Sequence, residues 1–272
     1  MLVVGELINC TRAKIREAVE RQDVAYIQDL ARRQVEAGAN YLDVNSGIPR
    51  KDVSTMEWLV SLVQEAVDLP LSIDSSDPDA IAKGLELCRR NGKVLDKPLV
   101  NSVNAEKDRL ERLLPILSEY RPKAIVMCMD SEGIPDTSEG KITIAARLIE
   151  QVARVGLPLD DIYVDPCVFP VSADKKHGGA ALDAVEKIMT SFPGVHTICG
   201  LSNISFGLPK RKQLNQGFLL LMMARGLDAI IADPLETRLM LNIITAETLL
   251  GRDDYCRNYI AAFRQGKMEG LV

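Results

Sequence analysis

The sequence predicts a single closed (β/α)8 barrel, and three observations support this fold class. Strand-like and helix-like stretches alternate from end to end, in eight units of about 30–35 residues each. The length of 272 residues is close to the roughly 250 typical of such a barrel. No change in composition marks a linker. We therefore expect one domain over 1–272, with the barrel and a final helix in 1–265 and a short tail in 266–272.

The first half of the chain supplies four strand–helix units. Short apolar runs predict buried strands, and apolar residues three and four apart predict helices. Gly38 is a natural helix stop, and Asp77 is a natural N-cap with Pro78 in the first turn. In order, we expect a strand at Leu2–Ile8, helices at Arg12–Glu20 and Val24–Gly38, a strand at Tyr41–Asn45, a helix at Asp52–Val67, a strand at Leu71–Asp74, a helix opening at Asp77, a polar insertion at Asn91–Pro98, a strand at Leu99–Asn101 and a helix at Ala105–Glu119.

The second half repeats the alternation four times. By the same two criteria we expect a strand at Ala124–Met129, a loop at Asp130–Gly140, a helix at Ile142–Gly156, a strand at Ile162–Asp165, a helix at Gly178–Ser191, a strand at His196–Ser202, a helix at Gln213–Gly226, a strand at Asp228–Ala232, a helix at Leu235–Leu250 and a short helix near Asp254–Phe263. An open doubly wound sheet is the alternative. Such a sheet binds nucleotides through a glycine-rich loop, and the sequence has neither G-x-G-x-x-G nor a Walker loop.

The overall composition excludes several classes of function. Hydrophobic residues make up 47% of the chain, charged residues 26%, and the formal net charge is −5. Without a basic cluster, nucleic acid is not the expected partner. No apolar run reaches the roughly 18 residues of a membrane span, and the first residues lack the charged leader of a signal peptide. We expect a cytoplasmic protein.

Cysteine and histidine usage gives little support for a metal site. The six cysteines are scattered without a C-x-x-C pair, as expected for reduced thiols. Cys128, Cys167 and Cys199 follow predicted strands, so a three-thiolate zinc site is conceivable but lacks a ligand motif. With only His177 and His196 in the chain, a histidine-based site is nearly excluded, and we predict no metal.

Polar side chains stand at the carboxyl end of every predicted strand, which is where barrel enzymes bind their substrates. They are Glu6 with Asn9, Asp43 with Asn45, Asp74 with Ser75, Asn101 with Ser102, Asp130, Asp165, Ser202 with Asn203, and Asp233. Any one of them has even odds of capping the following helix. A ring of matched polar groups on all eight strands instead indicates a binding site.

The chemistry of this ring favours a neutral heteroaromatic ligand. Carboxylates and carboxamides match a ring edge rich in N–H donors and C=O acceptors. A 2-amino-4-oxo pyrimidine presents adjacent N–H and NH2 donors to the two oxygens of a carboxylate, and a pterin has this edge. The stretch Thr197–Gly207 is the centre of the predicted site. We expect Asn203 there to need hydrogen-bond partners, since a buried unpaired amide costs about 1–3 kcal/mol.

Six short motifs in order make the chain similar to a known family. They are Gly5-Glu-Leu-Ile-Asn9, Leu42-Asp-Val-Asn45, Ser72-Ile-Asp-Ser75, Val100-Asn-Ser-Val-Asn-Ala-Glu106, Tyr163-Val-Asp-Pro166 and Gly200-Leu-Ser-Asn-Ile-Ser-Phe206. Together they resemble the pterin-binding barrel methyltransferases, specifically methyltetrahydrofolate:corrinoid protein methyltransferases and the folate domain of cobalamin-dependent methionine synthase. Each motif alone is weak. The resemblance spans residues 1 to about 263.

The resemblance implies a homodimer that binds tetrahydrofolate or 5-methyltetrahydrofolate in the barrel mouth. By similarity, Asp74, Asn101 and Asp165 would hold the pterin, and Asn203 would act catalytically beside N5. Gly200 and Ser202 would shape that turn, and Arg211 would lie near the folate tail. Glu6, Asp43, Asn45 and Phe206 are further possible contacts. Phe206 is a departure, because related acetogenic enzymes have a glutamine there, whereas an aromatic residue resembles the methionine synthase domain.

The resemblance also implies a corrinoid carried by a separate protein that docks transiently. A base-off corrinoid site displays D-x-H-x-x-G, whereas Asp174-Lys-Lys-His177-Gly178 has the wrong spacing. Two alternatives remain open: a dihydropteroate synthase-like enzyme and a non-catalytic folate-binding partner of a corrinoid protein. The first is recognised by a basic S-R-K-type segment after the seventh strand, where this chain has Ser202-Asn203-Ile204. The direction of methyl transfer does not follow from the sequence.

Overall fold

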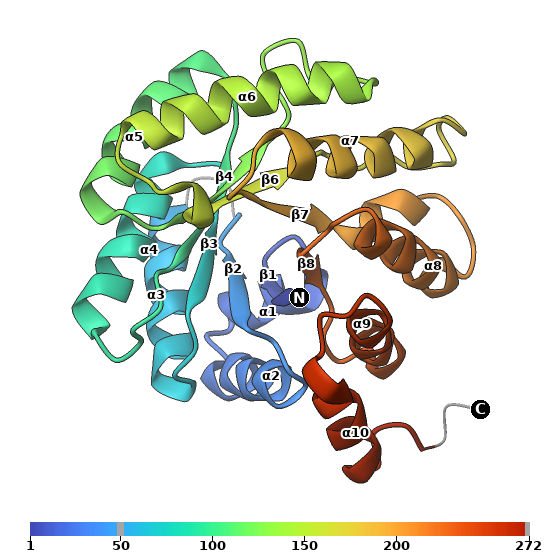
Figure 1. Cartoon of the computed structure of the whole chain (residues 1–272). Helices are drawn as coiled ribbons and strands as arrows, with labels where there is room; N and C mark the ends of the chain where they lie inside the picture. The colour runs from blue at the N-terminus through green and yellow to red at the C-terminus, as the bar shows by residue number, and fades with distance from the viewer. Residues whose placement is uncertain (48–51, 270–272) are drawn as a thin grey trace.

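Eight parallel strands close into a barrel in chain order, as the sequence predicts (Figure 1). The computed structural model describes residues 1–47 and 52–269. Each strand pairs with the next, and β1 pairs with β8 to complete the ring. The strands are β1 Leu2–Asn9, β2 Tyr41–Asn45, β3 Leu71–Asp74, β4 Leu99–Val103, β5 Lys123–Met127, β6 Ile162–Asp165, β7 His196–Gly200 and β8 Ala229–Ala232.

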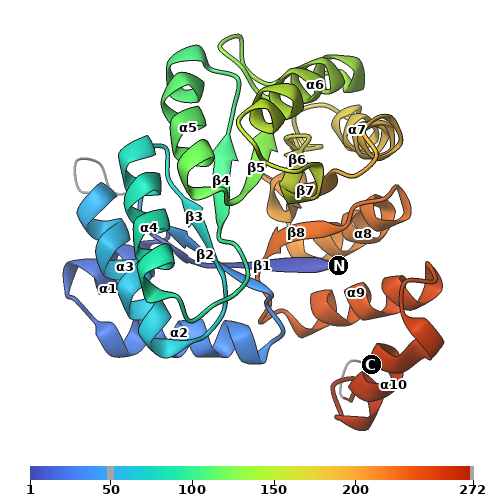
Figure 2. The same ribbon diagram turned by 60° about the vertical axis from the view of Figure 1, so that its left-hand side comes forward.

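The helices form an outer layer around the strands (Figure 2). Their apolar faces pack on the outward-facing strand residues, such as Leu42 and Val44, in the main hydrophobic cluster. None of the described helices is long and apolar enough to cross a membrane. They are α1 Ala13–Glu20, α2 Val24–Glu36, α3 Asp52–Ala66, α4 Pro78–Asn91, α5 Lys107–Tyr120, α6 Ser138–Arg154, α7 His177–Ser191, α8 Arg211–Ala224, α9 Thr237–Leu249 and α10 Arg257–Arg264.

The barrel interior is a separate, smaller apolar cluster. Because side chains alternate along a strand, every second residue faces inward. The buried inward cluster consists of Val4, Tyr41, Leu99, Ile125, Tyr163, Ile198 and Ala229. Two residues further along several of these strands, the same inward phase reaches Glu6, Asp43, Asn101 and Asp165. The polar groups therefore begin directly above an apolar floor.

Two differences from the predicted elements bear on the site. Strand β7 ends at Gly200 rather than Ser202, and Leu201–Ser205 forms a one-turn 3-10 helix, η2. Helix α6 begins at Ser138 rather than Ile142, because the Thr137 hydroxyl caps it by accepting from the Gly140 amide at 3.2 Å. Both ends depend on polar turns, which an apolar-run criterion does not detect.

Gly5 in β1 is required by a close approach from α2. The buried Gln34 side chain accepts a hydrogen bond from the Leu7 amide at 3.1 Å, where the β1–β2 register shifts. A Cβ on Gly5 would lie 2.6 Å from Gln34 Oε1. The glycine that opens the first motif thus allows α2 to hold the irregular stretch of β1 that follows Glu6.

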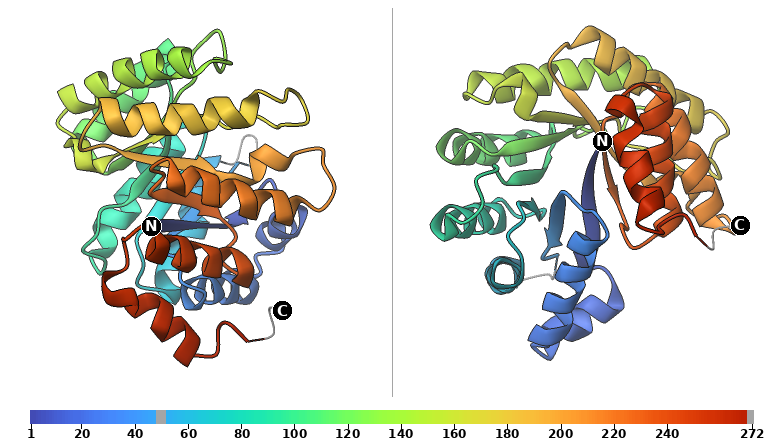
Figure 3. Two further views of the ribbon diagram at one scale, coloured as in Figure 1. Left: turned by 45° about the vertical axis from the view of Figure 1, so that its right-hand side comes forward. Right: turned by 60° about the horizontal axis from the view of Figure 1, so that its bottom comes forward.

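The amino end of the barrel is closed by internally paired polar groups. The Tyr41 hydroxyl donates to the Lys97 carbonyl at 2.9 Å, and the Lys97 ammonium pairs with Asp161. These contacts give the insertion Asn91–Pro98 a location, over the amino end and opposite the mouth. The chain's N-terminus lies at the start of β1 beside α9 (Figure 3), where the Met1 ammonium pairs with Glu247 at 2.8 Å.

Candidate functional site

Three predicted site residues are direct neighbours across the sheet. In the strand register Asn45 lies opposite Asp74, and Asp74 lies opposite Asn101. The Asn45 amide donates to the Asp74 carboxylate at 2.7 Å. The structure therefore brings β2, β3 and β4 together as one continuous polar surface at the carboxyl end of the barrel.

Asp43 lies beneath this surface and forms a carboxyl pair with Asp74. Asp43 is buried, and its Oδ1 accepts from the Ser72 hydroxyl at 2.6 Å and the Asn101 amide at 3.1 Å. Burial and the charge of Asp74 raise the pKa of Asp43 well above its usual range, and the two side chains are hydrogen-bonded. Burial also raises the pKa of Asp74, though less than that of Asp43, so Asp43 is the member of the pair that holds a proton more tightly.

Asp165, at the end of β6, is half-buried, as Asp74 is. Its Oδ1 accepts from the backbone amide of Cys167 at 2.7 Å. Burial raises the pKa of Asp165 to about 6, although that hydrogen bond and the nearby Lys141 charge oppose the rise. The group is an ionised acceptor at neutral pH that loses its charge in mild acid.

Asn203 stands in η2, on the opposite side of the mouth, with an exposed side chain. Its amide nitrogen lies over Gly200, 3.5 Å from where a Cβ on that glycine would be. Within the described residues, its carboxamide makes no hydrogen bond. The expected burial of Asn203 is wrong, because η2 lifts its side chain out of the strand and into solvent. An unpaired exposed carboxamide is free to bind a ligand.

Arg211 and Ser202 brace the η2 turn. The Arg211 guanidinium donates to the Ser202 carbonyl at 2.6 Å and to the Ser205 hydroxyl at 3.1 Å. It lies 5.9 Å from the centre of the Phe206 ring, which is 65% exposed. Arg211 thus holds the turn that presents Asn203, and Phe206 offers an apolar surface beside it.

Other polar strand ends cap their own loops instead of joining the site. Asn9 accepts from the Thr11 amide at 2.9 Å, Asp130 from the Glu132 amide at 3.0 Å, and Asp233 from the Leu235 amide at 2.9 Å. Glu6 forms an ion pair with Arg12 at 2.7 Å. Capping therefore accounts for Asn9, Asp130 and Asp233. Asn45 and Asp165 also accept from the amide two residues on, so this contact alone does not exclude a residue from the site.

Arg109, on α5, is a site-supporting residue that the sequence did not indicate. Its guanidinium donates to the carbonyls of Ser75 at 2.9 Å and Ser102 at 2.8 Å, and to that of Ser76. It thereby ties the ends of β3 and β4 together, with its positive charge toward Asp74. No local pattern reveals this contact, since it joins a helix to two separate strand ends.

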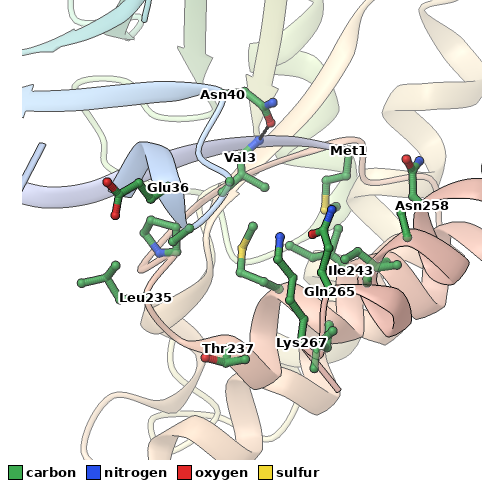
Figure 4. A pocket seen from close by; sticks show the side chains of 18 of the residues that line it. Met1, Val3, Glu36, Asn40, Leu235, Thr237, Ile243, Asn258, Gln265 and Lys267 are labelled. Atoms are coloured by element: carbon green, nitrogen blue, oxygen red, sulfur yellow. Dashed lines mark hydrogen bonds between the residues drawn. The ribbon is translucent and has the colours of Figure 1, made fainter. Parts of the chain in front are cut away.

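Two other kinds of site were considered in the described residues, a metal cluster and a cavity away from the mouth. In residues 1–47 and 52–269, no group of three or more histidine, cysteine or acidic side chains is arranged to hold a metal ion. A cavity of about 770 Å³ lies outside the barrel, between β1, α2, α9 and α10, with apolar walls that include Leu235 and Ile243 (Figure 4). It contains none of the predicted site residues.

Comparison with known proteins matches most of the chain. The family model for pterin binding enzymes matches residues 5–233. The chain is 38% identical over 271 residues to the methylcorrinoid:tetrahydrofolate methyltransferase of Eubacterium limosum, covering 98% of both. It is 30% identical over 245 residues to the methionine synthase of Mycobacterium tuberculosis, covering 85% of this chain and 20% of that longer protein.

Solved structures of the same fold are dihydropteroate synthases. The enzyme from Vibrio fischeri superimposes with a TM-score of 0.72 at 17% identity, covering 92% of this chain and 93% of that one. The Xanthomonas albilineans enzyme in complex with 7,8-dihydropteroate gives 0.68 at 16% identity, with 92% and 93% coverage. At these identities the likeness establishes the barrel fold alone.

Proposed function

Since the chain belongs to the pterin binding enzyme family, we propose that it transfers a methyl group between N5 of tetrahydrofolate and the cobalt of a corrinoid on a separate protein. It is a methyltransferase related along its whole length to an enzyme named for that pair of substrates. The observation that carries the proposal is the full-length 38% identity combined with acidic and amide side chains at the mouth.

The two ionisable positions fit the donor edge of a pterin. Asp74 and Asp165 would accept the ring N–H and NH2 groups, and Asn101 would supply a neutral partner between them. A carboxylate that accepts hydrogen bonds from a neutral donor gives a stronger contact than an uncharged acceptor does. Gly200 and Ser202 would shape the turn, with Glu6, Asp43 and Asn45 as supporting groups.

Asn203 would act at N5, where the methyl group leaves or arrives. In demethylation the N5–CH3 bond breaks, the methyl binds cobalt(I) to give methylcobalt(III), and N5 takes up a proton. A tertiary amine leaves poorly without that proton, and acid assistance is worth about 10²–10⁴-fold. Asn203 cannot supply the proton, but its unpaired amide can stabilise the protonated N5 from a fixed position. The proton would come from water or a hydrogen-bonded chain.

The corrinoid protein would dock transiently at the mouth and carry the cobalt to N5. Holding the methyl group in line with cobalt supplies much of the remaining rate. We also propose a homodimer, as the resemblance implies. Exposed apolar side chains on the last elements support a contact surface there, namely Leu249, Leu250, Tyr255, Ile260 and Phe263. Light scattering that gives the mass of one chain would contradict the dimer.

A methyl-transfer assay with free cob(I)alamin tests the proposed reaction. We expect 5-methyltetrahydrofolate to be consumed as the cobalt(I) absorbance converts to that of methylcobalamin, and the reverse with methylcobalamin and tetrahydrofolate. Tight folate binding without either conversion would favour the non-catalytic alternative. Formation of dihydropteroate from a pterin diphosphate and 4-aminobenzoate would favour the synthase alternative, which η2 disfavours because it offers neutral Asn203 rather than a basic segment.

A further inference from the structure

A buried lysine lies behind the proposed pterin carboxylate Asp165. Lys141 belongs to the first turns of α6, and its side chain is 2% exposed. Its ammonium donates to the Pro166 carbonyl at 2.6 Å and to the Cys167 carbonyl at 2.9 Å. It also lies 5.3 Å from the centre of the Phe169 ring. All three partners belong to the loop that leaves β6.

This arrangement is costly for stability alone. Burying an ammonium costs several kcal/mol unless a carboxylate compensates it. Among the residues that the structure describes, Lys141 forms no ion pair, and its two hydrogen bonds are to backbone carbonyls. A neutral donor would satisfy those carbonyls more cheaply, so the charge itself calls for an explanation.

The loop held by Lys141 also positions a hydrogen bond to Asp165. Cys167 has a left-handed backbone, with φ of 55°, and its amide donates to Asp165 Oδ1 at 2.7 Å. Since a non-glycine residue is strained in that region, other contacts must hold it there. Lys141 provides such contacts. Its ammonium binds the carbonyl of Pro166, which precedes Cys167, and the carbonyl of Cys167 itself.

Lys141 is also the only positive group acting on Asp165 among its described surroundings. The other ionisable groups facing it are the thiols of Cys128, Cys167 and Cys199, which burial keeps protonated by raising the pKa of each. Burial lowers the pKa of the Lys141 ammonium, and the neighbouring Asp165 and Asp136 carboxylates oppose that effect. The Lys141 charge thus opposes the effect of burial on the Asp165 carboxyl.

We propose that Lys141 is a positioning residue for the pterin site, which fixes the turn after β6 and places a positive charge behind Asp165, the proposed acceptor of the ligand's N–H groups. The proposal rests on the proposed function, because it assigns Asp165 to the pterin. It also gives a physical reason for that assignment. Burial favours the neutral form of a carboxyl, and a nearby fixed cation favours the charged form.

The test compares tetrahydrofolate affinity between pH 5.5 and 8.5 in the parent and in Lys141→Met. In the parent we expect affinity to fall as pH drops through about 6, where Asp165 protonates. Without the ammonium, the carboxyl should titrate at higher pH. A rise of about one unit would weaken binding about twofold at pH 7 and close to tenfold at pH 5.5. Binding at pH 8.5 should recover toward the parent's. Titration of the ligand itself affects both proteins equally.

Three further variants separate charge from structure. Lys141→Gln keeps a donor for one carbonyl without the charge, and should show the same pH shift if Lys141→Met folds poorly. In an Asp165→Asn background, Lys141→Met should no longer move the pH profile. Lys83→Met removes a half-buried lysine on the outer helix α4, which pairs with Glu86 at 3.1 Å, and should leave the profile unchanged. Equal weakening at every pH, or none, would overturn the positioning role of the charge.

A carbon NMR titration of the Asp165 carboxyl keeps the inference testable if folate does not bind. The carboxyl should titrate at higher pH in Lys141→Met than in the parent. An unchanged titration overturns the inference even if folate binds. A shifted titration in a protein that binds no folate would instead contradict the proposed function and leave the lysine–aspartate coupling established.

Discussion

The two ends of the barrel both carry polar side chains, but they differ in how many of those side chains have hydrogen-bond partners within the protein. At the amino end, both ring nitrogens of His196 are engaged, by Asp228 at 2.6 Å and Asp160 at 3.1 Å. The His196 ring also stacks on Tyr163 with 4.8 Å between centroids. At the carboxyl end, the Asn203 carboxamide is unpaired within the described chain, and Asp165 accepts one backbone amide.

The difference separates polar groups that stabilise the fold from those that are available for function. A buried polar group that finds its partners inside the protein contributes stability, whereas one held open contributes only when a ligand arrives. Removing a group at the mouth that is proposed to contact the ligand should therefore change catalysis or binding. Removing a group at the amino end should change stability alone.

Replacing Asn203 with alanine should give the largest effect. We expect kcat to fall about 10²–10³-fold, the usual loss when one fixed transition-state donor is removed. Folate affinity should weaken much less, because the amide acts at N5 as charge develops. Stopped-flow methyl transfer and equilibrium binding measure the two quantities. Asn9→Ala, which removes a loop cap at the end of β1, is the matched control and should leave kcat intact. Equal losses in turnover and binding would refute the role of Asn203.

Replacing either pterin carboxylate should weaken folate binding by about 10–100-fold. The estimate follows from the roughly 1.5–3 kcal/mol contributed by a hydrogen bond to a charged group. Calorimetry on Asp74→Asn and Asp165→Asn provides the measurement. The matched control is Asp130→Asn, a strand-end carboxylate that caps its own turn and pairs with Arg147 at 3.2 Å. If both site variants bind folate as tightly as the parent, the pterin lies elsewhere.

Acid should weaken folate binding before it unfolds the protein. Because the pKa of Asp165 is raised to about 6, its charge is present above that pH and lost below it. Each pH unit below about 6 should then reduce affinity by up to about tenfold. Asp165→Asn should bind more weakly but without this step. A step that persists in the variant would assign the pH dependence to another group.

Replacing His196 with glutamine should have the smallest effect, confined to stability. Hydrogen bonds to Asp228 and Asp160 raise the pKa of His196 above its usual value. Their contribution is therefore present below the unfolded pKa and is lost as pH rises through the folded pKa. We expect a loss of about 1–2 kcal/mol, or a few degrees in Tm, at pH 6, and less at pH 9. A lower kcat/KM in a variant that folds like the parent would contradict the assignment of His196 to stability alone.

Local patterns in the sequence predict the fold because each strand is a short apolar run and each helix has an apolar stripe. The same patterns place Asp74, Asn101 and Asp165, the pterin residues that we propose, at one mouth, since polar groups just beyond apolar strands meet there. They cannot distinguish these from Asn9 and Asp130, because the choice between capping a loop and facing a ligand depends on backbone direction after the strand.

Most of the site features that the sequence did not predict depend on contacts between distant segments. Arg109 and Lys141 lie on helices, and nothing in their neighbours indicates that they reach strand-end carbonyls. The exposure of Asn203 was missed for a local reason: residues Leu201 to Ser205 look like the end of a strand but turn into a 3-10 helix. The position of the insertion before β4 likewise depends on a contact between distant segments, the hydrogen bond from the Tyr41 hydroxyl to the Lys97 carbonyl.

The pairing of the Asp43 and Asp74 carboxyls, both with raised pKa values, has a consequence for how ligand binding is measured. If the pair keeps its single proton when a neutral ring binds, association exchanges no protons with the medium at a pH well above that of Asp165 titration. Heats of binding at pH 8 should then coincide in phosphate and Tris, despite the different ionisation enthalpies of these buffers. The two neighbouring acids would thus keep a combined charge of −1 before and after ligand binding, whichever buffer is used.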